Sequence, residues 1–214
     1  MVNRVFYLFI WITFTVYGFG FAPESQPDTL TLIQNLSTGH WSEINPWIIS
    51  LFNAMGLWPI LYTALLLRDG QKQKFPAWPF AVGSFFVGAF AVLPYLILRT
   101  SNPEQEYELT QIKGWESRVL AIAVSIGFLV LLGFGFSQGN WSSFTQQWYS
   151  DRFIHVMSLD FCMLSILMPS LTLADRQGRE TTLPIWVDFI PAIGGLAYLC
   201  FRGPVQLSSE TQNP

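Results

Sequence analysis

Long apolar stretches separated by short polar segments dominate the sequence. The hydrocarbon core of a bilayer is about 30 Å thick, so a spanning helix needs roughly 17–25 apolar residues. The stretches that meet or approach this length are 5–21, 46–67, 80–98, 119–136, 153–173 and 183–201. The pattern predicts an all-α, polytopic integral membrane protein with about six transmembrane helices, flanked by Trp and Tyr at the membrane interfaces.

The first stretch has two interpretations. Arg4 precedes an apolar run that ends near Ala22, which is the outline of a cleavable signal peptide. Against cleavage, Pro23 follows Ala22 directly and the run is rich in bulky aromatic residues. We therefore expect a retained span.

The two halves of the chain match in the same order. An Arg-Val pair leads to Gly-Phe-Gly-Phe in the first and fourth spans, an Asp follows the second and fifth, and Pro-x-Trp opens the third and sixth, which both close on Tyr-Leu-x-x-Arg. These matches predict two three-helix units, 1–100 and 118–203, joined by an acidic loop at 101–117 and followed by a polar tail at 204–214. Because each unit would hold an odd number of spans, fully inserted units would have inverted topology.

The placement of basic residues predicts the orientation of the first half. Arg68, Lys72 and Lys74 follow the second span, whereas segment 22–45 contains no Lys or Arg. Cytoplasmic loops carry an excess of these residues, so we expect a cytoplasmic N-terminus. The second half stays open, because its basic residues are balanced by nearby acids.

Composition excludes several classes of protein. Hydrophobic residues make up 51% of the chain and charged residues only 12%, about half the usual share. The formal net charge of −3 argues against nucleic-acid binding, which needs a basic face. The aromatic content of 16% argues against disorder, because such a chain buries its side chains.

Asp160 is the strongest candidate for chemistry inside a span, where a charged group costs roughly 2.5–3.5 kcal/mol on insertion scales. One interpretation makes it a proton carrier or a ligand-binding carboxylate. The other makes it a buried hydrogen-bond partner of Tyr198 or Arg202, since the sixth span ends where the fifth begins. With His155, these residues form the candidate intramembrane polar site. Asp188 lies near an interface, and we expect it to be solvated.

His155 is the histidine that lies within a predicted span. It could ligate a haem or a chlorophyll magnesium, so a pigment such as chlorophyll or carotenoid is a candidate cofactor. The alternative is an ordinary hydrogen-bonding role near the interface. Cys162 and Cys200 lie at depths too different for a disulfide, and we predict no metal site.

Two further patterns bear on function. The sequence contains no P-loop, GxGxxG, GxSxG or HExxH motif, which disfavours an enzyme and leaves a lipid- or isoprenoid-modifying activity as the weakest hypothesis. Pro59, Pro94, Pro169 and Pro191 lie within spans, and interrupted helices are typical of transporter binding sites.

Two blocks of the sequence resemble known families. Segment 127–202, with its glycine-rich helix, Asp160 and Tyr-Leu-x-x-Arg ending, resembles small, roughly three-span bacterial membrane proteins of unknown function. Segment 45–99, with NAMGLWPILYTALLLRDGQ and FPAWPF, is similar to longer uncharacterised membrane proteins of cyanobacteria and chloroplasts. The resemblance implies a photosynthetic source and a thylakoid or plasma membrane, and it carries no catalytic residue to transfer.

These observations lead to two functional hypotheses. The first is a non-catalytic accessory or assembly factor that docks on a larger, photosynthetic membrane complex. The alternative is a small secondary transporter or channel that uses Asp160 and proline-broken helices. The expected partners are the lipid bilayer and a larger membrane complex, with no nucleic acid.

Overall fold

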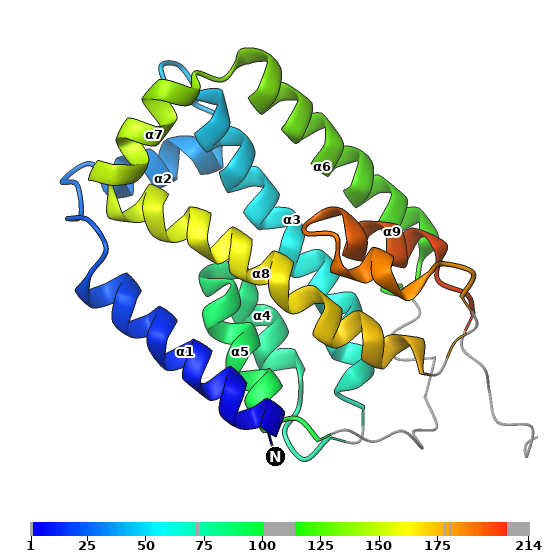
Figure 1. The fold of residues 1–214 in the computed structure, drawn as a ribbon. Helices are drawn as coiled ribbons and strands as arrows, with labels where there is room; N and C mark the ends of the chain where they lie inside the picture. The colour runs from blue at the N-terminus through cyan, green and yellow to red at the C-terminus, as the bar shows by residue number, and fades with distance from the viewer. Residues whose placement is uncertain (1, 72, 101–113, 178, 180, 205–214) are drawn as a thin grey trace, which may run out of the picture.

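The computed structural model describes residues 2–71, 73–100, 114–177, 179 and 181–204, and the regular elements in them are helices (Figure 1). Of the predicted loop and tail, positions 101–113 and 205–214 lie outside the described residues. In chain order the elements are α1 (Val2–Gly20), α2 (Thr29–Thr38), α3 (Pro46–Asp69), α4 (Trp78–Val87), α5 (Ala89–Leu98), α6 (Arg118–Gln138), α7 (Trp141–Ser150), α8 (Arg152–Arg176), the 3-10 helix η2 (Ile185–Phe189) and α9 (Ile193–Phe201).

Three of the described helices, α3, α6 and α8, are long and apolar enough to cross a bilayer. α1 is apolar but shorter, and the third and sixth predicted spans are each divided into two helices. The all-helical fold predicted from the sequence is thus confirmed for the described residues. The count of six spans is not confirmed.

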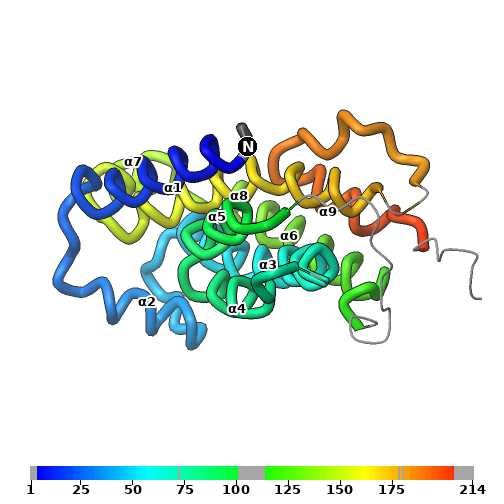
Figure 2. Tube along the Cα trace, turned by 90° about the horizontal axis from the view of Figure 1, so that it is seen from below, coloured from blue at the N-terminus to red at the C-terminus, as the bar shows by residue number. Residues whose placement is uncertain are grey.

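The third predicted span is a helical hairpin rather than one helix. The chain reverses at Gly88, which has φ +51° and ψ −124°, a conformation that residues with a Cβ rarely adopt. The ring centroids of Phe80, early in α4, and Tyr95, late in α5, lie 5.6 Å apart. The start of α4 and the end of α5 therefore lie at the same end of the bundle. Seen end-on, α5 lies between α1 and α4 (Figure 2).

The sixth predicted span is divided in a similar way, into η2 and α9. Ala192, just before α9, has φ 62°, and Gly194 lies so close to the carbonyl oxygens of Val187 and Asp188 that a Cβ would not fit there. The chain therefore folds back on itself here too.

The prolines predicted to break the spans mostly do not. Pro59, Pro94 and Pro169 lie inside α3, α5 and α8, and only Pro191 adjoins a break. Surrounding groups in a membrane helix can accommodate a proline, so the helix continues through it. The breaks instead coincide with Gly88 and Ala192, two residues with positive φ.

At one end of the bundle, here called the basic end, α1, α4 and α6 begin and α3, α5, α8 and α9 end. The Arg4 guanidinium donates to the Arg99 carbonyl (3.0 Å), joining the start of α1 to the end of α5. Arg68 pairs with Asp175, joining the ends of α3 and α8. Arg202 donates to the carbonyl of Trp115 (3.2 Å), joining the end of α9 to the segment before α6. All Lys and Arg that the structure describes lie at this end except Arg152.

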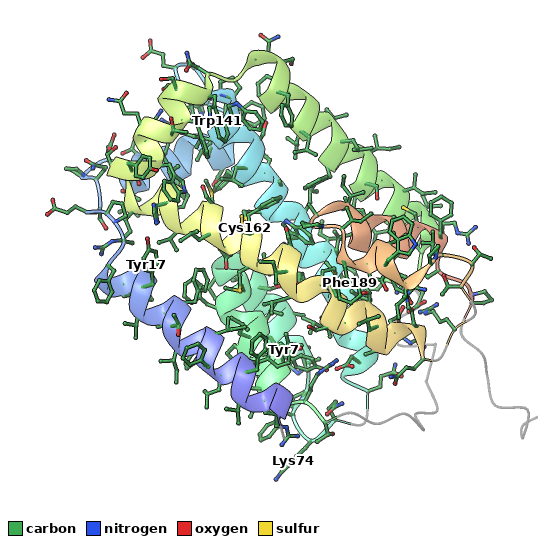
Figure 3. The ribbon with its side chains drawn as sticks, viewed as in Figure 1. Tyr7, Tyr17, Lys74, Trp141, Cys162 and Phe189 are labelled. Carbon is green, nitrogen blue, oxygen red and sulfur yellow. The ribbon has the colours of Figure 1, made fainter. Side chains whose placement is uncertain are left out.

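At the other end, here called the acidic end, α1 and α6 end and α3 and α8 begin. Asn45 donates to the carbonyl of Asn140 (2.7 Å), and Arg152 donates to the carbonyl of Pro23 (2.7 Å). Lys74 and Trp141, labelled in Figure 3, mark the basic and acidic ends. It follows that α1 and α6 run in one direction and α3 and α8 in the other. The inverted topology expected of two three-span units is not confirmed.

Two short helices, α2 and α7, lie near the acidic end and were not predicted (Figure 1). The residue before α7, Asn140, is its N-cap, and the Asn140 side chain accepts a hydrogen bond from the Ser143 N–H (2.9 Å). Both helices are too short and too polar to be recognised as membrane spans from the sequence.

α3 lies at the centre of the core. Its Trp58 ring packs edge-on against Phe128 of α6 and Phe161 of α8, and the Tyr62 hydroxyl donates to the Leu164 carbonyl (2.6 Å). α6 approaches α3 closely at Gly135, where an added Cβ would lie 3.0 Å from Ser50 Oγ. Small residues at such crossings let membrane helices pack tightly.

Candidate functional site

Asp160 meets the tip of the α4–α5 hairpin near the middle of α8. Its Oδ1 accepts a hydrogen bond from the backbone N–H of Ala89 (2.8 Å), the first residue of α5. A Cβ added at Gly88 would overlap the same carboxylate, so only glycine fits at the tip. A helix N-terminus has partial positive charge, and it therefore stabilises a carboxylate in this position.

A cavity of about 720 Å³ opens beside Asp160. It lies between α1, α3, α8 and the hairpin tip, and the segment before α2 closes part of it. Its walls are mainly aromatic: Trp11, Phe19, Phe52, Phe85, Phe86, Phe90 and Phe153 line it. Its volume is in the range of small-molecule sites.

The charged groups of this cavity are Asp160 and Arg152, which lie two turns apart on α8. Arg152 donates to the carbonyls of Pro23 and Ala22, so it is held at the acidic end of the cavity. Oδ2 of Asp160 has no hydrogen-bond donor among the described residues. The buried hydroxyl of Thr15, also on the cavity wall, has no partner there either. The cavity thus contains unsatisfied polar groups in apolar surroundings.

The hydrogen bonds predicted between Asp160 and Tyr198 or Arg202 are wrong. Tyr198 donates its hydroxyl to Asp175 (2.7 Å), and Arg202 pairs with the same carboxylate (3.3 Å). The prediction placed the end of α9 beside the start of α8. Because the sixth span folds back, α9 ends beside the end of α8 instead.

Asp175 is the centre of a buried ionic cluster at the basic end. Besides Arg202, it pairs with Arg68 and with Arg179 (3.0 Å), and Arg179 also pairs with Glu116. Burial lowers the pKa of Arg179, but the carboxylates of Asp175 and Glu116 raise it by more, so this guanidinium stays charged. Since each charged side chain named here lies against at least one of opposite charge, the cluster has the character of a structural anchor.

The first half contains a smaller version of this arrangement. Tyr95 and Arg99, at the end of α5, bond to Asp69, with Arg99 at 2.8 Å. Tyr198 and Arg202, at the end of α9, make the equivalent bonds to Asp175. The matched Asp, Tyr and Arg of the sequence therefore occupy matched places in the structure.

His155, grouped with Asp160 in the candidate polar site, makes its hydrogen bonds to other residues. Its Nδ1 lies 2.9 Å from the Trp148 carbonyl, and its Nε2 lies 2.9 Å from the Tyr17 hydroxyl. Because a carbonyl only accepts, Nδ1 carries the proton and Nε2 accepts from Tyr17. A haem or chlorophyll ligand would have to displace Tyr17, so this geometry fits a hydrogen-bonding role. Pigment binding stays a prediction.

The remaining candidate residues have structural positions. Asp188, expected to be solvated, is buried and pairs with Arg176 (2.6 Å), because η2 folds back over the end of α8. Cys162 and Cys200 are both free thiols. No cluster of three or more His, Cys, Asp or Glu side chains suited to a metal occurs in the part of the chain that the structure describes.

Sequence reasoning found Asp160 but missed its partners. Gly88 and Ala89 were read as part of a continuous span, because nothing in an apolar run marks a reversal except the glycine itself. Thr15 and the aromatic residues of the cavity walls have no distinguishing pattern in the sequence, because only the packing of separate helices brings them together. No protein-family model, curated protein or solved structure matches this chain, so the resemblance described above stays an expectation.

Proposed function

We propose that this protein is a small membrane transporter whose solute-binding group is the Asp160 carboxylate. The observation that carries the proposal is a buried carboxylate that faces a cavity of about 720 Å³ at the tip of a helical hairpin. Ionisable residues inside spans are expensive, and they commonly mark the pathways of substrates and protons. This role was the alternative hypothesis from the sequence, and the cavity now favours it.

The two oxygens of Asp160 have different tasks in this proposal. Oδ1 caps α5 through Ala89, and Oδ2 faces the cavity, where it can accept a proton or bind a cationic group. A proton and a cationic ligand compete for Oδ2, because each neutralises the charge of the same carboxylate. Neutralisation also weakens the attraction between the carboxylate and the N-terminus of α5. Binding at Oδ2 would therefore be coupled to the position of the hairpin tip.

We also propose that the two halves are a tandem repeat in parallel orientation, like the repeats of some secondary transporters. Each half has a long helix, a short helix, a second long helix and a folded-back third element. The halves differ where the cavity lies. α6 packs closely along α3, whereas α1 packs along α5 and reaches α8 mainly through long side chains.

The distribution of charge supports an orientation for this transporter. The basic end carries the described Lys and Arg residues other than Arg152, whereas Glu24, Asp28 and Glu43 lie toward the acidic end. By the positive-inside rule, the basic end would face the cytoplasm, or the stroma in a thylakoid. The N-terminus would then be cytoplasmic, as expected from the sequence.

Access of water to the cavity tests the transporter. In a chain without Cys162 and Cys200, we expect Val156→Cys to react with a small, water-soluble methanethiosulfonate reagent, because Val156 lines the cavity between Arg152 and Asp160. The matched control is Val130→Cys, in the middle of α6 and 64% exposed on the outer surface, which a bilayer would cover. It should not react.

The outcome against a transporter would be equal protection of both cysteines in folded, membrane-inserted protein. The cavity would then be closed to water, and the accessory role predicted from the sequence would regain first place. That role stays a prediction with its own test. Deleting the gene should then remove a larger complex from native gels of the membranes.

A further inference from the structure

We infer that the ligand of the Asp160 cavity is a lipophilic organic cation that enters from the bilayer. The inference deepens the proposed function, on which it rests, by naming the class of substrate. Three features of the cavity lead to it: the position of its rim, the chemistry of its walls and the single acid in its interior.

The rim of the cavity reaches the surface that hydrocarbon would cover. Phe86 lines the cavity and is 83% exposed, and it lies two residues before the hairpin tip at Gly88. The tip meets Asp160 near the middle of α8, so Phe86 lies at mid-membrane depth. Phe85 and Val87 are also exposed rim residues. An opening of this kind admits molecules dissolved in lipid.

The walls of the cavity select for aromatic or aliphatic bulk. Rings from α1, α3, α5 and α8 surround the space, and they present π faces that attract a cation as well as apolar area. α1 is held against α8 by two tyrosine hydroxyls, that of Tyr7 to Ser170 (2.8 Å) and that of Tyr17 to His155. Tyr7 lies one turn before the part of α1 that lines the cavity, and Tyr17 lies within that part (both are labelled in Figure 3).

The charge in the interior sets the sign of the ligand. Oδ2 of Asp160 is without a donor among the described residues, and the hydroxyl of Thr15 lines the same space. Arg152 stands at the acidic end of the cavity, two turns away, where its guanidinium donates to backbone carbonyls. A lipophilic anion would meet the carboxylate unfavourably, whereas an organic cation would neutralise it.

A pair of probes with the same shape and opposite charge tests the inference. Tetraphenylphosphonium is a cation and tetraphenylborate an anion, and both dissolve in lipid. We expect the full chain in detergent micelles to bind tetraphenylphosphonium, measured by equilibrium dialysis. Loss of the charged partner in Asp160→Asn should weaken this binding roughly ten- to a hundredfold. Glu43→Gln, which removes an exposed carboxylate outside the cavity lining, should bind as the unmodified chain does.

A second variant tests the cavity without touching Asp160. Gly56 lines the cavity, and a Cβ added there meets nothing within 4 Å. Gly56→Leu should therefore fold but fill the space and abolish binding of tetraphenylphosphonium. Gly133→Leu is the matched control, because Gly133 of α6 has equally open surroundings and lies outside the cavity.

Several results would overturn the inference. They are equal binding of the two probes, binding of the cation that Asp160→Asn leaves unchanged, and binding that survives Gly56→Leu. If the water-accessible Val156→Cys reacts but tetraphenylphosphonium fails to bind, the transporter stands and the class of substrate is wrong. If Val156→Cys is protected, the transporter itself fails.

Discussion

Two buried aspartates on the same helix have opposite surroundings. Asp175 is surrounded by Arg68, Arg179 and Arg202, and it also accepts the Tyr198 hydroxyl. Asp160 has one backbone N–H and an open cavity. A buried charge that is fully paired serves stability, and one that is left partly unsatisfied is available for a ligand. Asp160 is therefore the candidate for function and Asp175 the candidate for folding.

This division predicts different costs for two matched substitutions. Asp175→Asn leaves several buried guanidinium groups without their carboxylate, which should cost about 3–5 kcal/mol of folding free energy. Asp69→Asn weakens the analogous pair with Arg99, whose side chains are both 16% exposed, and because one guanidinium rather than three loses its carboxylate it should cost less, about 1–2 kcal/mol.

Thermal unfolding of both variants in the same detergent measures the difference. A loss of thermal stability as large in Asp69→Asn as in Asp175→Asn would contradict the special role of the Asp175 cluster. Expression level is a useful second readout, because a cost of several kcal/mol reduces the amount of folded protein.

At the level of elements, the hairpin depends on one glycine. Gly88→Ala should cost about 1–3 kcal/mol in backbone strain, and it also displaces Asp160 from the Ala89 N–H. Gly133→Ala is the matched control. Since Gly133 lies inside α6 with open surroundings, alanine there should be neutral or stabilise the helix by up to about 1 kcal/mol.

The shift in unfolding temperature of the two alanine variants, each relative to the unmodified chain, tests this prediction. If Gly88→Ala proves as stable as Gly133→Ala, then residues 80–98 form a continuous helix, as the sequence pattern first suggested. Binding of tetraphenylphosphonium to a folded Gly88→Ala variant would also show whether the hairpin tip positions Asp160.

At the level of the whole molecule, the folded-back elements decide which loops share a side. Lys74 follows α3 and Thr182 follows α8, and both lie at the basic end, whereas Glu24 lies at the acidic end. Single cysteines at these positions, in a chain without Cys162 and Cys200, should be labelled from one side for Lys74→Cys and Thr182→Cys. Glu24→Cys should be labelled from the other side.

Oriented vesicles and a membrane-impermeant maleimide provide the measurement. Six full spans with inverted halves would place Thr182→Cys on the side of Glu24→Cys, so that pattern would rule out the parallel arrangement. The same experiment reports whether the basic end faces the cytoplasm, because the side of the vesicle is known.

The sequence by itself determined the helical class, identified α3, α6 and α8 as stretches long and apolar enough to span a bilayer, and singled out Asp160 as a candidate site residue. These follow from local quantities: the length and polarity of each stretch and the cost of a charge in hydrocarbon. The matching Asp, Tyr and Arg at the ends of the halves were also visible as a pattern. Helix length and residue spacing are properties of one stretch of sequence, so they can be inferred without knowing how the helices pack.

Only the tertiary structure decided that the third and sixth predicted spans fold back, and this one feature changed several conclusions. It moved Tyr198 and Arg202 from Asp160 to Asp175, buried Asp188 against Arg176, and brought the basic residues to one end. Hydropathy cannot distinguish one long apolar helix from two short ones that pack on each other. The choice depends on the space between neighbouring helices, and the cavity beside Asp160 is a product of that packing.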